Sequence, residues 1–189
     1  MTPPFFSIGH SDRSLAAFIS LLGEARIELV ADIRKMPASR ANPQFNAQAL
    51  QDGLAQVGIS YEHMAALGGL RGKAPASGDL NGLWTNRSFR NYADYALGEP
   101  FQVGLRHLLE RGRRWRCALM CAEAVWWRCH RRIVVDYLLA RGETVFHIIG
   151  AGRLEAARLT PGAVIRADGT IIYPAAPPVA GVAASAAAP

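Results

Sequence analysis

Short apolar runs alternate along the chain with longer stretches in which apolar residues recur every three or four positions. The short runs predict buried strands, at residues 5–8, 28–33, 59–63, 115–121 and 144–149. The helical spacing predicts helices after Ser14, from Ala47 to Val57, after Ser88, from Pro100 and from Cys129 to just before Gly142. Strands that alternate with helices favour an α/β fold with a mainly parallel sheet of about five strands and helices on both faces.

Local signals refine this picture at several points. Ser14 is predicted to cap the first helix, and Gly58 is predicted to end the second. Residues 164–173 contain Asp168-Gly169 between two apolar runs, a pattern typical of a β-hairpin. Residues 67–83 are Gly-rich without periodicity, which indicates a candidate functional loop or lid. We expect a single three-layer domain over residues 1–173 and an Ala/Pro-rich disordered tail over 174–189.

Size and composition fit a packed protein. The chain has 189 residues, half of them apolar, and three cysteines. No apolar run approaches the roughly 20 residues that span a bilayer, and the first residues lack the features of a signal peptide. We therefore expect no membrane partner, a cytoplasmic location and reduced thiols.

The net charge is +6, and arginine far outnumbers lysine. A basic surface favours anionic partners such as phosphorylated small molecules, nucleotides or nucleic acid. Arginine binds phosphate and carboxylate through a planar fork, so its excess favours shaped anion sites. A general bias in base composition of the genome explains the same excess equally well.

The most informative segment is residues 118–132, in which a predicted buried strand ends in Cys121 and Glu123 and a predicted helix begins near His130. The carboxyl ends of parallel strands meet at one edge of a sheet, where ligands bind. A nearby cation or helix start lowers the pKa of a thiol, so Cys121 is a candidate nucleophile or redox thiol. Glu123 and His130 would then transfer protons, and Asp32 would orient an arginine or bind a metal.

Several other loops at the carboxyl ends of the predicted strands contain candidate anion-binding residues. The turn Gly9-His10-Ser11 lies before a helix, where main-chain N–H groups and the helix dipole favour anions, although neither a Walker loop nor a G-x-G-x-x-G motif is present. The candidate substrate-binding residues are His10, Ser11, Arg13, Arg34, Ser39, Arg40, His63, Arg90 and Arg131.

Alternatives to these assignments stay open. Cys121 is equally consistent with a small buried apolar residue, and Cys129 with packing on the sheet. The cysteines, Glu123 and His130 include acceptable zinc ligands, but their spacing is unlike that of structural zinc sites, so we assign no metal. Trp126 and Trp127 suit core packing better than base stacking. Residues 86–92 mix cations and aromatics, which suits single-stranded nucleic acid but also an ordinary amphipathic helix.

The chain resembles the bacterial domain of unknown function 488 family over residues 5–173. The resemblance rests on the motifs around Ser7–Ser14, Asp32–Arg40, Tyr61–His63 with Leu67–Gly69, Phe89–Tyr95 and Cys121–Arg132. In many relatives a proline lies between the two cysteines, where this chain has Trp126 and Trp127, which indicates a subgroup. The resemblance implies a compact α/β domain and assigns no activity.

The function expected from the residues is an enzyme that acts on a phosphorylated or nucleotide-like anion. The alternatives are a non-enzymatic nucleic-acid or nucleotide binding protein and a metal-binding regulatory module. The sequence indicates neither a cofactor nor an oligomeric state.

Overall fold

A computed structural model of the chain describes residues 2–73 and 79–175. Within these residues, one six-stranded sheet has the order β3-β2-β4-β1-β5-β6. The first five strands along the chain pair with one another in parallel, which confirms the predicted mainly parallel sheet: β1 (Phe5–Gly9), β2 (Leu29–Asp32), β3 (Ser60–His63), β4 (Cys117–Cys121) and β5 (Val145–Gly150).

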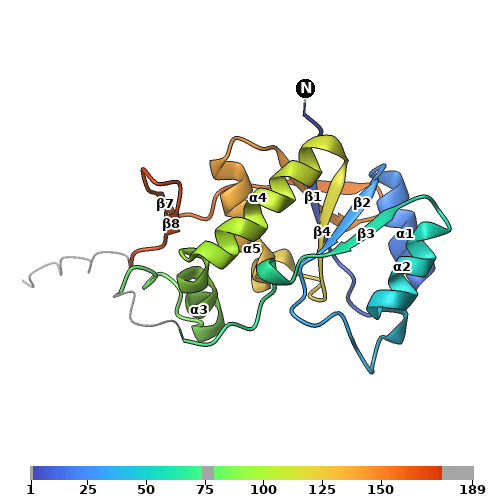
Figure 1. Ribbon diagram of the computed structural model, residues 1–189, viewed down its shortest axis with the longest axis horizontal. Coiled ribbons are helices and arrows are strands. Elements are labelled where there is room, and N and C mark those ends of the chain that lie inside the picture. Colours follow the sequence, from blue (N-terminus) through green and yellow to red (C-terminus); the bar gives the residue numbers. More distant parts are fainter. Residues whose placement is uncertain (1, 74–78, 176–189) are drawn as a thin grey trace, which may run out of the picture.

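Helices cover both faces of the sheet, as predicted (Figure 1). One face packs against α1 (Leu15–Glu24) and α2 (Ala47–Ala55). The other packs against α3 (Arg87–Ala96), α4 (Glu99–Arg114) and α5 (Arg131–Ala140). Because side chains alternate along a strand, Phe6 and Ile8 of β1 enter the first core and Phe5 enters the second. One hydrophobic core thus lies on each face of the sheet, between the strands and the helices. The fold is a three-layer α/β arrangement.

Two helix caps test the predictions directly. Ser14 caps α1, since its hydroxyl accepts a hydrogen bond from the main-chain N–H of Ala17. The cap of α3 is Asn86 rather than Ser88, because the Asn86 side chain accepts from the N–H groups of Ser88 and Phe89. Short 3-10 turns lie at Pro43–Phe45, Ala65–Leu67 and Trp126–Arg128.

The C-terminal part adds antiparallel strands. β6 (Arg153–Ala156) pairs with β5 and was not predicted, because all four of its residues are exposed and give no apolar alternation. The predicted hairpin is present as β7 (Val164–Ile165) and β8 (Ile171–Ile172), which form a separate two-stranded sheet. Gly169 in its turn has φ +77°, a conformation that glycine adopts at little cost.

The strand order creates a switch in chain direction between β1 and β4. These neighbours lie side by side, with Gly9 opposite Cys121. After β1 the chain passes through α1, on one face of the sheet, to β2, which lies beyond β4. After β4 it passes through α5, on the opposite face, to β5, which lies beyond β1. Such a reversal opens a crevice at the carboxyl ends of the strands.

Three further expectations concern the C-terminal tail, the candidate lid and membrane-spanning helices. The predicted tail falls outside the described residues from position 176 on, and the candidate lid lies partly outside them, at 74–78. Among the described helices, none has the length and apolar character needed to cross a bilayer.

Candidate functional site

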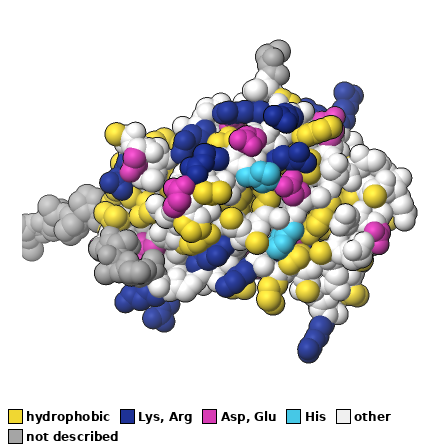
Figure 2. Space-filling model, viewed as in Figure 1, with side chains coloured by type: hydrophobic (Ala, Val, Ile, Leu, Met, Phe, Trp, Pro, Cys, Tyr) yellow, Lys and Arg dark blue, Asp and Glu magenta, His cyan; other side chains and the backbone are white. Residues whose placement is uncertain are grey.

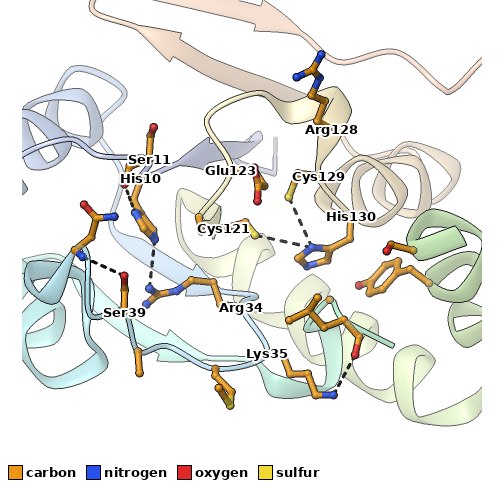
Figure 3. A pocket seen from close by; sticks show the side chains of 18 of the residues that line it. His10, Ser11, Arg34, Lys35, Ser39, Cys121, Glu123, Arg128, Cys129 and His130 are labelled. Atoms are coloured by element: carbon orange, nitrogen blue, oxygen red, sulfur yellow. Dashed lines mark hydrogen bonds between the residues drawn. The ribbon is translucent and has the colours of Figure 1, made fainter. Parts of the chain in front are cut away.

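A cavity of about 760 Å³ lies at the carboxyl ends of β1, β2 and β4 (Figure 3). Its walls come from the loops that follow these strands, from the segment after Ala65–Leu67, from α3 and from the segment before α5. Among the predicted site residues, it brings together His10, Ser11, Arg34, Ser39, Cys121, Glu123 and His130. The predicted convergence of distant segments on one edge of the sheet is therefore present in the structure.

Arg34 is the cation of the cavity with the most hydrogen bonds to other residues. The fully buried carboxylate of Asp32 accepts hydrogen bonds from Arg34 Nη2 at 2.6 Å and Nε at 2.9 Å. It also accepts one from the Tyr61 hydroxyl at 2.8 Å. Arg34 Nη2 donates in addition to the main-chain oxygen of Phe45 at 2.8 Å. Asp32 thus lies behind Arg34 and orients it, which matches one of its two predicted roles.

His10 is held as a neutral acceptor next to Arg34. Its Nδ1 lies 2.7 Å from the Ser11 carbonyl oxygen, which only accepts, so the ring proton is on Nδ1. Nε2 then faces Arg34 Nη1 at 3.4 Å. The ring stacks on Phe45, with centroids 4.2 Å apart. Burial and the charge of Arg34 lower the pKa of His10, which favours the neutral ring.

The expected anion site on the Gly9-His10-Ser11 turn is wrong in one respect. The main-chain N–H groups of His10 and Ser11 donate to the carbonyl oxygens of Cys121 and Ala122, each at 2.9 Å. These donors join the two neighbouring loops and do not serve an anion. Gly9 permits this contact, because a Cβ at that position would lie 1.8 Å from the Glu123 carbonyl oxygen.

Two thiols and an imidazole meet on one side of the cavity, and we call Cys121, Cys129 and His130 the thiol–imidazole cluster. His130 Nδ1 lies 3.9 Å from Cys121 Sγ and 3.7 Å from Cys129 Sγ, and Figure 3 shows both contacts converging on that nitrogen. His130 Nε2 lies 3.0 Å from the carbonyl oxygen of Ile33. A Cβ at Gly69 would lie 2.8 Å from Nδ1, so glycine leaves room for the ring.

The electrostatics favour Cys129 over Cys121 as the ionised thiol, contrary to the sequence-based hypothesis. The hydrogen bond between the two thiols and burial raise the pKa of Cys121. Burial opposes ionisation of Cys129 as well. The hydrogen bond from Cys121, the charge of Arg131 and the Arg131 main-chain N–H outweigh it and lower the pKa of Cys129 to about 7. A thiolate beside an imidazole can act as a nucleophile or as a metal ligand.

Arg131 shapes the loop that carries these groups. Its guanidinium is buried and donates to the main-chain oxygens of Glu123 at 2.5 Å and Ala124 at 2.9 Å. The cavity is not lined by this side chain, so the expectation that Arg131 binds substrate is not supported. Its charge instead helps to lower the pKa of Cys129, and its hydrogen bonds hold the loop after β4 in place.

Four other predicted residues are also absent from the described cavity walls: Arg13, Arg40, His63 and Arg90. Arg13 donates to the Gly9 carbonyl oxygen at 2.6 Å. His63 Nε2 lies 2.8 Å from the Arg34 carbonyl oxygen. Arg90 forms an exposed ion pair with Asp79, and Arg40 is exposed. These residues have local structural contacts or face solvent, and the structure does not bring them to the crevice.

Sequence reasoning missed several residues that do line the cavity. Lys35 and Arg128 are its additional cations. Lys35 directly follows Arg34, and Arg128 directly precedes Cys129, so the signal that could have identified both is their adjacency to candidate site residues. Cys129 is buried in the core, as predicted, but its sulfur also faces the cavity, because α5 begins only at Arg131.

A second hollow of about 520 Å³ adjoins the first and shares Phe89, Glu123 and Arg128 with it. Its walls include Trp84, which stacks on Phe89 with centroids 4.9 Å apart, and the half-exposed Trp127. Trp127 therefore does not follow the prediction of core packing. Trp126 is partly buried and stacks on the buried ring of His147, with centroids 4.3 Å apart, but it belongs to neither hydrophobic core.

The basic character of the chain is dispersed on the face that Figure 2 shows. Lys and Arg side chains lie there at several places and are interspersed with Asp and Glu. This face therefore does not present one continuous basic stripe of the kind that follows a nucleic-acid backbone.

Comparison with known proteins identifies a family and nothing more specific. A family model described as "Domain of unknown function DUF488" matches residues 14–138, a shorter stretch than the resemblance over 5–173. No curated protein and no solved structure shows significant similarity to the chain.

Proposed function

The chain belongs to the DUF488 family, a domain of unknown function, and we propose that it is an enzyme acting on a phosphorylated or nucleotide-like anion. The observation that carries the proposal is that one cavity is lined both by cations and by the thiol–imidazole cluster. Cations alone would suit a binding protein. Reactive groups beside them suit chemistry on a bound anion.

Arg34, Lys35 and Arg128 are the cations assigned to the anion. The Nε and Nη2 atoms of Arg34 donate to Asp32 and Phe45, so the guanidinium is held in place and its Nη1, directed toward His10, is the donor assigned to the anion. Preorganised donors bind a phosphate more strongly, because less side-chain freedom is lost on binding. Arg128 and Lys35 are exposed and add charge at the rim.

The thiol–imidazole cluster is assigned the reaction, and Glu123 is assigned proton transfer. Glu123 is exposed and lines both hollows, so its carboxylate has access to a substrate and to water. General acid–base catalysis needs such a group within hydrogen-bond reach of the reacting atoms.

The second hollow favours a nucleotide-like substrate over a small inorganic anion. The rings of Trp84, Phe89 and Trp127 provide apolar surface for a planar base, and Arg128 lies between the two hollows. Stacking of a base on an aromatic side chain contributes about 1–3 kcal/mol.

Binding of inorganic phosphate and of nucleoside monophosphates, measured by calorimetry, tests the first part of the proposal. Arg128→Met is expected to weaken binding about tenfold, the effect of losing one hydrogen bond to a charged group. Arg158→Met removes the same charge from an exposed site that is not part of the cavity and is the matched control. Equal loss in both variants, or no binding by the wild type, overturns the proposal.

Turnover of the bound compounds, followed by ³¹P NMR, tests the second part. Cys129→Ser is expected to keep phosphate binding and lose turnover. Binding without turnover by the wild type favours a non-enzymatic nucleotide binding protein. Binding of polynucleotides alone, with affinity that falls steeply with salt, favours the nucleic-acid alternative.

A further inference from the structure

We propose that Cys121, Cys129 and His130 bind one zinc ion and leave its fourth coordination position open to the cavity. The three ligand atoms, two sulfurs and one ring nitrogen, all lie within 4.8 Å of one another. This assigns a metal to the thiol–imidazole cluster, for which sequence spacing alone favoured none.

The separations suit a tetrahedral ion. With Zn–S bonds of about 2.3 Å and Zn–N bonds of about 2.0–2.1 Å, tetrahedral angles require about 3.6 Å between nitrogen and sulfur. The distances from His130 Nδ1 to the two sulfurs are 3.9 and 3.7 Å. Side-chain shifts of a few tenths of an ångström close the difference for these two pairs. The two sulfurs, which lie within 4.8 Å of each other, must also approach to about 3.8 Å, the separation that two Zn–S bonds at a tetrahedral angle require.

The imidazole is already oriented for coordination. A carbonyl oxygen only accepts hydrogen bonds, so the contact between His130 Nε2 and the Ile33 carbonyl at 3.0 Å requires the proton on Nε2. The lone pair of Nδ1 then points at the two sulfurs. Metal-binding histidines commonly donate their other ring N–H to a carbonyl or carboxylate in this way.

The surroundings also stabilise the thiolates that a metal needs. The main-chain N–H of Arg131 donates to Cys129 Sγ at 3.5 Å, and the buried guanidinium of the same residue supplies positive charge nearby. Both thiols are at least nine-tenths buried, which limits competition from water. Gly69 leaves space beside Nδ1 that a larger residue would fill.

The ligand set selects the type of metal. Thiolate and imidazole favour zinc or another soft to borderline transition metal over magnesium or calcium, which prefer oxygen. Three protein ligands with a fourth position open are typical of catalytic zinc, whereas structural zinc has four protein ligands. A zinc ion in this site would lower the pKa of a water in its open position to near 7, and Glu123, which lines the same cavity, would be the carboxylate available to exchange a proton with it.

The catalytic role of the metal rests on the proposed function, but metal binding is measured without any substrate. Apoprotein prepared with a chelator is titrated with Zn²⁺ in competition with a chromophoric chelator. Titration with Co²⁺ reports coordination through thiolate-to-metal charge-transfer bands and tetrahedral d–d bands. The wild type is expected to bind one equivalent and to show both sets of bands.

Variants identify the ligands. Cys129→Ser and His130→Gln are each expected to weaken zinc binding by roughly a hundredfold or more. Such a loss exceeds the roughly 10- to 100-fold loss expected when a residue that only orients a metal ligand is replaced. Cys117→Ser is the matched control, since Cys117 is a fully buried cysteine in β4 outside the cluster. It is expected to retain wild-type affinity and the cobalt spectrum.

Two results overturn the proposal: less than one tightly bound equivalent in the wild type, or cobalt spectra without thiolate bands. The wild-type measurements do not depend on whether a variant folds. Phosphate affinity of apoprotein and of Arg128→Met is measured in parallel. Loss of metal binding with intact phosphate binding contradicts the metal site alone, and the reverse contradicts the proposed anion-binding function alone.

Discussion

The ion pair between Asp32 and Arg34 makes the sharpest prediction, because it connects the core to the cavity. Asp32 is fully buried and Arg34 is 6% exposed, so neither charge is screened by solvent. Asp32→Asn removes the negative charge and places an amide N–H₂ group among donors from Arg34 and Tyr61. Removal of one partner of a buried ion pair costs about 3–5 kcal/mol, because the other charge stays buried and unpaired.

Urea denaturation measures this cost, and two further variants give its physical origin. Tyr61→Phe removes one hydrogen bond to the same carboxylate and is expected to cost about 1.5 kcal/mol. Asp32→Asn combined with Arg34→Met leaves no unpaired charge and is expected to recover part of the loss. A loss below about 1 kcal/mol in Asp32→Asn, the range of exposed ion pairs, refutes the reasoning.

The same substitution also affects binding at a distance. Asp32 does not line the cavity, yet Arg34 does, so a folded Asp32→Asn variant is expected to bind phosphate about tenfold more weakly. Unchanged phosphate affinity in that variant would show that Arg34 needs no orientation by Asp32.

Three other substitutions test separate parts of the structure. Gly69→Ala should displace His130, because the added Cβ would lie 2.8 Å from the His130 Nδ1, and the displacement should alter the imidazole resonances in NMR spectra. Gly72→Ala is the control: its added Cβ meets nothing within 4 Å, so these resonances should stay unchanged. Burial and a nearby positive charge lower the pKa of His147 from 6.5 to about 4, so between pH 6.5 and pH 4 the imidazole is protonated in the unfolded state but not in the folded state. The free energy of unfolding, measured with urea, should therefore fall as the pH drops from about 6.5 to about 4. The variant His147→Phe should show a weaker dependence on pH. Tyr173→Phe removes a 2.8 Å hydrogen bond to a buried carboxylate of α5 and should cost about 1–3 kcal/mol by thermal denaturation; no loss would mean that this bond does not anchor the hairpin.

Much of the fold follows from local sequence signals, for physical reasons that particular elements illustrate. The strands β1 and β4 are buried on both faces, so they appear as continuous apolar runs. The Ser14 cap follows from hydrogen-bond chemistry within one turn. The strand β6 has no such signal, because its pairing with β5 comes from the main chain and its side chains are all exposed.

The candidate site was predictable in its location and only partly in its chemistry. Parallel strands determine where the loops converge, so the positions of Cys121 and His130 at one edge followed from the pattern. The directions of side chains did not follow. Arg131 turns to the carbonyl oxygens of the loop after β4. Cys129 turns to the cavity because α5 begins only at Arg131, two residues later than the apolar spacing predicted.

The central claim is that an anion binds in the cavity beside the thiol–imidazole cluster. Side-chain ¹H–¹⁵N NMR spectra recorded during titration with a nucleoside monophosphate test it most directly. We predict that the largest shifts occur at Arg34 and Arg128, with smaller shifts at His10 and His130. Shifts confined to the exposed arginines of α4, or no saturable shift at any side chain of the cavity, would contradict the account.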